Sequence, residues 1–167
     1  LKSAFSDFIE SIVDSTSGIY YRGATPDYGQ SINGAMKVLT ALDWLQIPIH
    51  YPQQLIDTCL SHFPSSEGCH LVDTVYVLYR CLQYTKHRKD EIIDYLRTII
   101  DMIKTHYNSD GGFSYHVNRS QTNYYNIRIS KGLPESDLHG TLLMIWAITL
   151  ILEICEKNTF GWRVLKP

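Results

Sequence analysis

The sequence lacks the cysteine spacing of a disulfide framework or of a common zinc module. No two of its four cysteines stand in C-x-x-C spacing; they are Cys59, Cys69, Cys81 and Cys155. At least three of them fall within apolar helical patterns, where a free cysteine behaves as a small hydrophobic residue. We therefore expect reduced, buried thiols rather than disulfides. Reduced thiols favour a cytoplasmic setting.

An excess of charge of one sign is also missing. Lysine and arginine number 15 and aspartate and glutamate 17, for a net charge of −2. The short basic run KHRK, at 86–89, falls in an expected connection between helices. This balance gives no electrostatic reason to expect nucleic acid or anionic lipid as a partner.

Long hydrophobic runs are absent as well. The most apolar stretch, 142–154, is interrupted by Thr149 and Glu153 and is too short to span a bilayer. The sequence also lacks a signal-peptide pattern, so we expect no membrane span. Because the first residue is Leu1 rather than methionine, we expect a fragment or half of something larger.

Helical periodicity is abundant, and no segment shows a convincing strand alternation. Apolar residues recur at helical spacing in six segments, at 2–14, 31–45, 52–63, 69–84, 88–106 and 137–154. With 44% hydrophobic residues over 167 positions, we expect a single all-α domain, 1–167, with its own core.

The six expected helices alternate between two kinds. The first, third and fifth have an apolar stripe and a polar face, which is typical of outer helices. The second, fourth and sixth are more apolar around their circumference, which is typical of inner helices. Three successive outer–inner hairpins predict a curved helical array.

Aligning the three inner helices places INGA (32–35), VDTV (72–75) and LHGT (138–141) at the same position. Asn33, Asp73 and His139 then lie at equivalent places near three helix N-termini. We expect them to form a polar ring at one end of a concave surface.

The sequences DGGFSY (110–115) and ESDLHGTLLMIWAITLI (135–151), together with the alternation of helices, resemble the α/α-toroid superfamily. This superfamily contains protein prenyltransferase β-subunits and squalene or terpenoid cyclases. The resemblance implies a ring of inner and outer helices with an apolar pocket that opens at one end. Complete rings have about twice as many helices, so the resemblance implies a partial toroid, about half a ring.

The metal site of the prenyltransferases is matched only in part. They hold zinc with an aspartate, a cysteine two residues later and a histidine from a later inner helix. Asp73 and His139 match the aspartate and the histidine, but Val75 replaces the cysteine. Two good ligands do not complete a four-coordinate zinc site. We expect no cofactor, with zinc as the alternative.

Asp73 and His139 are the candidate catalytic residues. A carboxylate and an imidazole at a pocket mouth would serve as an acid–base pair, because histidine titrates near neutrality. Asp73 has a structural alternative, an acid satisfied by a hydrogen-bond partner. For Asp137, just before the last helix, we favour capping of the helix N-terminus.

The candidate substrate-binding residues lie near the same helix ends; they are Asn33, Lys37, Arg22, Tyr21, Tyr124 and Tyr125. The two cations would bind an anionic group, although each has an exposed, solvated alternative. Aromatic hydroxyls at a pocket mouth suit sugar rings or the polar end of a lipid. The loop 116–136, which carries two of these tyrosines, is long enough to form a lid or to contact a partner.

Two functions remain open. The first is an enzyme that acts on an isoprenoid, lipid-linked or carbohydrate substrate. The second is a non-catalytic half toroid that binds a ligand or associates with another chain. A half ring leaves the flanks of helices 31–45 and 137–154 uncovered, so we expect self-association or contact with further chain segments.

Overall fold

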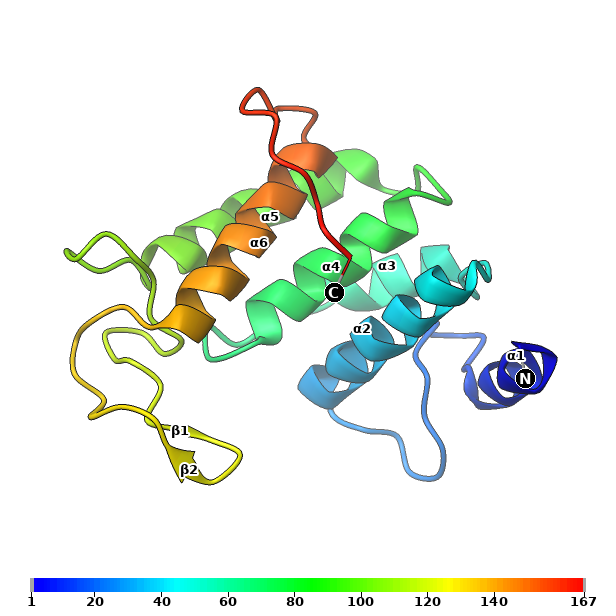
Figure 1. Cartoon of the computed structure of the whole chain (residues 1–167). Coiled ribbons are helices and arrows are strands. Elements are labelled where there is room, and N and C mark those ends of the chain that lie inside the picture. Colours follow the sequence, from blue (N-terminus) through cyan, green and yellow to red (C-terminus); the bar gives the residue numbers. More distant parts are fainter. Residues whose placement is uncertain (1, 167) are drawn as a thin grey trace.

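The structure of the chain, a computed structural model, describes residues 2–166. Its helices are α1 (Lys2–Ile12), α2 (Tyr28–Leu45), α3 (Pro52–Leu60), α4 (His70–Leu82), α5 (Lys89–Lys104) and α6 (Leu138–Ile154). A short antiparallel hairpin, β1 (Asn123–Tyr124) and β2 (Ile127–Arg128), follows α5 and precedes α6 along the chain, at the lower left of Figure 1. The mostly helical fold and all six helices are confirmed. The hairpin was missed because two residues per strand cannot show an alternation.

The start of α2 differs from the prediction by three residues. Asp27 accepts a hydrogen bond from the backbone N–H of Gln30 at 2.8 Å, so the helix begins at Tyr28 and not at residue 31. An aspartate in this position satisfies one of the N–H groups that the first turn leaves unpaired.

α4 is the central helix of the domain. It packs between α2 and α6 and also contacts α3 and α5, which lie behind this row in the view of Figure 1. Most of its side chains are buried, including Asp73 and Arg80. A helix with neighbours on nearly every side must be apolar around its circumference, as its sequence is.

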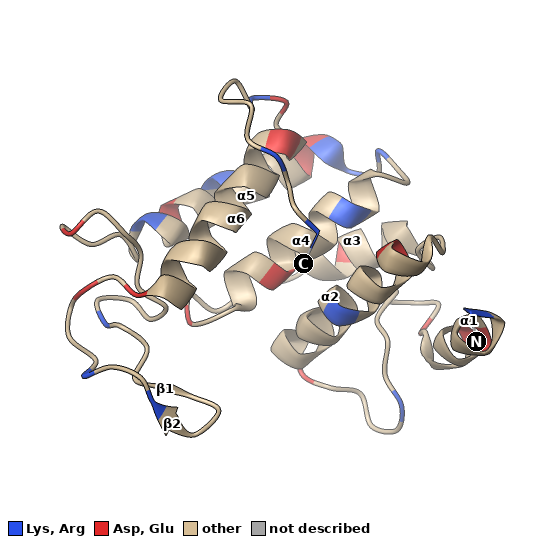
Figure 2. Ribbon diagram, viewed as in Figure 1, with Lys and Arg blue, Asp and Glu red and all other residues tan. Residues whose placement is uncertain are grey.

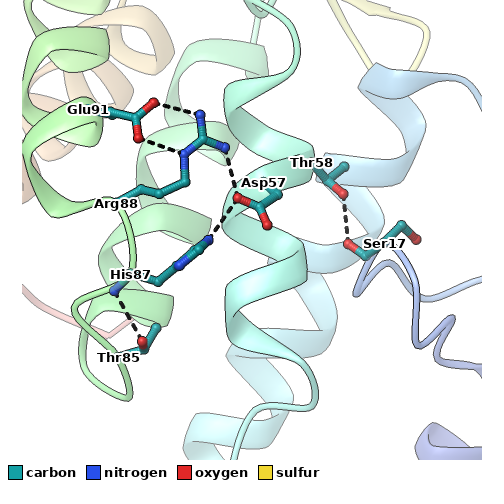
Figure 3. Close-up of polar contacts among 7 residues, drawn as sticks. All are labelled: Ser17, Asp57, Thr58, Thr85, His87, Arg88 and Glu91. Atoms are coloured by element: carbon teal, nitrogen blue, oxygen red, sulfur yellow. Dashed lines mark hydrogen bonds and ion pairs between the residues drawn. The ribbon is translucent and has the colours of Figure 1, made fainter.

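The amphipathic helices α3 and α5 bury one face each against this row. On the outside they are joined by a charged network around Asp57, shown in Figure 3. Asp57 Oδ1 lies 2.9 Å from His87 Nε2 and accepts from Arg88 Nη1 at 2.8 Å. Arg88 also donates to both carboxylate oxygens of Glu91, at 3.0 and 2.7 Å. Because these side chains are partly exposed, water screens the pairs.

The flank of α6 that faces away from α4 and α5 carries a stripe of exposed apolar side chains. Leu138, Leu142 and Ile145 are 87%, 64% and 43% exposed. Charged side chains are absent from α6 until its last turn (Figure 2). In residues 2–166, no helix is both long and apolar enough to cross a membrane.

All four cysteines are free, as expected, with Cys59 and Cys81 buried in the core. Beyond α6 the chain turns back and crosses α4, where Val164 packs against the core (Figure 1). Lys166 then reaches α2 and pairs with Asp43 at 3.0 Å.

Candidate functional site

The N-terminal ends of α2, α4 and α6 lie at the same end of the domain (Figure 1). Asp137 organises this end. Its Oδ1 accepts from the backbone N–H of Gly140 at 2.7 Å, which caps α6. Its Oδ2 accepts from the N–H groups of Tyr115 and Gln121, at 2.8 and 2.9 Å. The capping role expected for Asp137 is confirmed, and the same carboxylate fixes two loop segments.

Asn33 and Asp73 are direct neighbours. The amide Nδ2 of Asn33 donates to Oδ2 of Asp73 at 2.8 Å and joins α2 to α4. Asp73 is only 2% exposed, and this burial raises the pKa of its carboxyl group, against the effects of Asn33 and of the nearby His70 and Lys37 charges. Asp73 also lines a hollow of about 100 Å³ beside Tyr28.

His139 lies at the same end of the domain, in the first turn of α6, and has other partners. Its Nδ1 is 2.9 Å from Oε1 of Gln121, and since an amide oxygen only accepts, Nδ1 carries a proton. In the neutral ring, Nε2 is then an acceptor. Burial lowers the pKa of His139, although the charge of Asp137 opposes this effect. The neutral imidazole is therefore favoured.

Tyr115 connects the two regions. Its ring stacks on His139 with the centroids 4.7 Å apart and the planes 18° apart. Its hydroxyl lies 3.4 Å from Sγ of Cys69, the residue that precedes α4. Within residues 2–166, no hydrogen bond joins Asp73 to His139 directly. The two candidate catalytic side chains thus share one end of the domain but have different partners.

The hairpin brings a second aromatic ring to His139. The ring of Tyr124 meets the imidazole edge-on, with centroids 5.6 Å apart at 84°. Tyr125 packs against Tyr124 and is 85% exposed. The turn is tight because Tyr125 and Asn126 have φ values of 46° and 66°, as two-residue hairpin turns require. Through the contact of Tyr124 with His139, the loop 116–136 lies beside the N-terminal end of α6.

Two of the other candidates, Tyr21 and Arg22, lie apart from these contacts. Tyr21 and Arg22 line a separate hollow beside α1, together with Phe8 and Ile12. Lys37 is exposed on α2, one turn after Asn33. The structure thus brings together Asn33, Asp73, His139 and Tyr124, and it separates Tyr21 and Arg22 from them.

Sequence reasoning missed the importance of Gln121 and understated that of Tyr115. Gln121 carries no motif, because its contact with His139 arises only from the path of the loop. Tyr115 carried a signal, since it follows the glycine turn of DGGFSY. We call the residues of these contacts at this end of the domain the mouth cluster; it consists of Asn33, Cys69, Asp73, Tyr115, Gln121, Tyr124 and His139.

Over the described range 2–166, no three histidine, cysteine, aspartate or glutamate side chains are grouped as they would be around a metal ion. Comparison with known protein families, with curated proteins and with solved structures finds no match for this chain.

Proposed function

We propose that the chain is part of an α/α toroid, with α2, α4 and α6 as inner helices and α3 and α5 as outer helices. Three features support this arrangement. Helices α2, α4 and α6 form one row, their N-termini lie together, and the amphipathic helices α3 and α5 pack behind them. A partial ring of this kind presents one concave face with a polar end.

We further propose that the mouth cluster binds a carbohydrate, either free or as the polar end of a lipid-linked molecule. The observation that carries this proposal is that exposed aromatic rings lie directly beside a hydrogen-bonded polar side chain: Tyr124 contacts His139, which is hydrogen-bonded to Gln121. Tyr124 and Tyr125 offer exposed ring faces, and His139 offers Nε2 as an acceptor beside them. Sugars present apolar ring faces and hydroxyl groups together, so both kinds of contact would be used.

The test is a titration with chito-, malto- and cello-oligosaccharides, in which the NMR signals of His139 report binding. Farnesyl phosphate is titrated in the same way as the isoprenoid comparison. We expect a saturable change with an oligosaccharide. Tyr124→Ala should weaken it by about threefold to tenfold, as expected for the loss of one aromatic contact. Tyr84→Ala is the matched control, because Tyr84 is 46% exposed against 47% for Tyr124 and lies beyond the opposite end of α4.

A response to farnesyl phosphate alone would replace the carbohydrate by an isoprenoid ligand. No response to any probe would contradict ligand binding by the mouth cluster. An equal effect of the two tyrosine substitutions would remove Tyr124 from the site.

A second candidate function is association through α6. It is favoured by Leu138, Leu142 and Ile145, which form one exposed stripe at helical spacing. Light scattering should then detect a dimer that Leu142→Glu dissociates and Phe8→Glu, on α1, does not. A monomer at all concentrations would exclude this function for residues 1–167.

A further inference from the structure

The opposite end of α4 contains a second hollow, which is separate from the mouth cluster. The C-terminal segment, residues 157–166, crosses this end of the helix, and we call it the strap (Figure 1). Beneath it lies a chamber of about 180 Å³. Its walls are Asp43, Tyr76, Tyr79, Arg80 and Gln83, and its roof is Val164, Leu165 and Lys166.

Arg80 is the central polar group of this strap chamber, and it is 5% exposed. Within the part of the chain that the structure describes, its guanidinium forms one ion pair, from Nη1 to Oδ1 of Asp43 at 2.6 Å. Its Nε is buried and has no hydrogen-bond partner among those residues. Buried donors are nearly always paired, so a vacant Nε on a buried arginine indicates a missing acceptor.

The charges around the chamber also leave a positive excess. Asp43 is already shared, because its Oδ2 pairs with Lys166 at 3.0 Å while its Oδ1 pairs with Arg80. Among residues 2–166, two cations therefore face one carboxylate at the chamber wall. The hydroxyl of Tyr76, another wall residue, accepts a hydrogen bond from Oγ1 of Thr40 at 3.3 Å. An additional monoanion would balance the charge.

We propose that the strap chamber binds a small carboxylate. In a guanidinium group, the N–H bonds of Nε and Nη2 point in parallel from one edge. Asp43 pairs with Nη1, and the Nε of that edge has no hydrogen-bond partner within residues 2–166. The two oxygens of a planar carboxylate match these donors, which is the geometry of strong bidentate arginine pairs. Tyr79 and Gln83 line the same chamber and would contact the rest of the ligand.

The size of the chamber limits the ligand. At about 180 Å³ it is smaller than the roughly 300–1,000 Å³ typical of pockets for drug-sized molecules, so a short acid is expected. The strap would serve as the lid of the chamber. Lys166 fastens the end of the strap to α2, and the N–H of Trp162 donates to Asn158 Oδ1 at 3.2 Å near its beginning.

The test follows the Nε–H resonance of Arg80 by ¹⁵N NMR during titration with sodium acetate, sodium phosphate or sodium chloride at equal ionic strength. We expect a saturable shift with acetate and none with chloride. Acetate should also raise the thermal unfolding midpoint of the parent protein. Arg80→Lys keeps the charge but lacks the two parallel donors, and it should lose this increase.

Two further variants keep the proposal testable if Arg80→Lys folds poorly. Lys166→Met removes a charge from the roof of the chamber and should weaken acetate binding several-fold. Arg97→Lys, on the exposed face of α5, is the control and should bind acetate like the parent. Equal shifts with acetate and phosphate would overturn the carboxylate assignment. An Arg80 resonance that does not respond to acetate would overturn the site as a whole.

This inference does not depend on the proposed function, because the two sites share no residue. An acetate response without any oligosaccharide response would support the strap chamber and contradict carbohydrate binding at the mouth cluster.

Discussion

Asn33 holds Asp73 by a single hydrogen bond of 2.8 Å across the contact between α2 and α4. Because Asp73 is almost fully buried, this amide is what makes its carboxylate tolerable inside the domain. We expect Asn33→Ala to lower the free energy of unfolding by about 1–3 kcal/mol, the cost of leaving a buried polar group unpaired. Urea unfolding at neutral pH measures it, and no loss of stability would show that water replaces the amide.

Asp73→Asn, unlike Asn33→Ala, should not lower the free energy of unfolding at neutral pH. Burial raises the pKa of Asp73 above its ordinary value of 3.8. The folded state therefore binds a proton more readily than the unfolded chain, and stability from this group is lost as the pH rises from 3.8 through the folded pKa. Asp73→Asn should remove this loss and be at least as stable as the parent at pH 7. A variant that is less stable at every pH would contradict the desolvation argument.

His139 should affect the pH dependence of stability in the opposite direction to Asp73. Its pKa is lowered by burial, so the unfolded chain binds a proton more readily than the folded protein. Stability from this group is present above the ordinary histidine pKa of about 6.5 and is lost as the pH falls through the lowered folded pKa. NMR titration of the ring should give a midpoint below that value.

His139→Phe is the informative variant for this residue. It keeps a ring to stack on Tyr115 and removes the titrating group. The variant should fold and should lose the decline in stability between neutral and mildly acidic pH. An unchanged decline would assign it to another histidine.

Much of the fold was predictable because it depends on local periodicity. The isoleucine spacing of α5 and the apolar circumference of α4 each follow from burial, which acts on every turn of a helix. The end of each helix was less predictable, since it depends on single contacts such as Asp27 with Gln30.

The mouth cluster was predictable only in part. The alignment of the three apolar helices predicted equivalent positions for Asn33 and Asp73, and the two side chains are hydrogen-bonded. Asp73 lies in the first turn of α4 and Asn33 in the second turn of the adjacent helix α2. The alignment could not place Tyr21 and Arg22, whose position depends on how the segment before α2 folds back on α1. Nor could it reveal Gln121, since no periodic pattern governs the loop 116–136.

The network in Figure 3 should contribute little to stability but should make it depend on salt. Hydrogen bonds and the charges of Arg88 and His87 lower the pKa of Asp57, despite an opposing effect of desolvation, and the side chain is 49% exposed. Stability from this group is therefore present above the ordinary aspartate pKa and is lost as the pH falls through the lowered value. Asp57→Asn should cost at most about 1 kcal/mol at low salt, because exposed pairs are screened. Unfolding at two salt concentrations measures it, and a cost that salt does not reduce would contradict the screening argument.

Gly34 and Gly140 occupy equivalent positions in INGA and LHGT, yet alanine should have opposite effects at the two sites. A Cβ atom on Gly140 would lie 2.3 Å from the backbone nitrogen of Tyr115, because the DGGFSY turn packs directly on α6. A Cβ atom on Gly34 would find its nearest neighbour, the carbonyl oxygen of Tyr20, at 3.8 Å, which is ordinary contact.

Gly140→Ala must therefore displace backbone, and we expect it to lower the free energy of unfolding by about 1–3 kcal/mol or more, as overpacking does. Gly34→Ala adds a better helix former without a clash and should raise it by up to about 1 kcal/mol. Thermal and urea unfolding of the two variants give the comparison, and each serves as the control for the other. Equal effects would mean that the turn before α6 does not pack on the helix as closely as described, and Tyr115 would then no longer be held against His139.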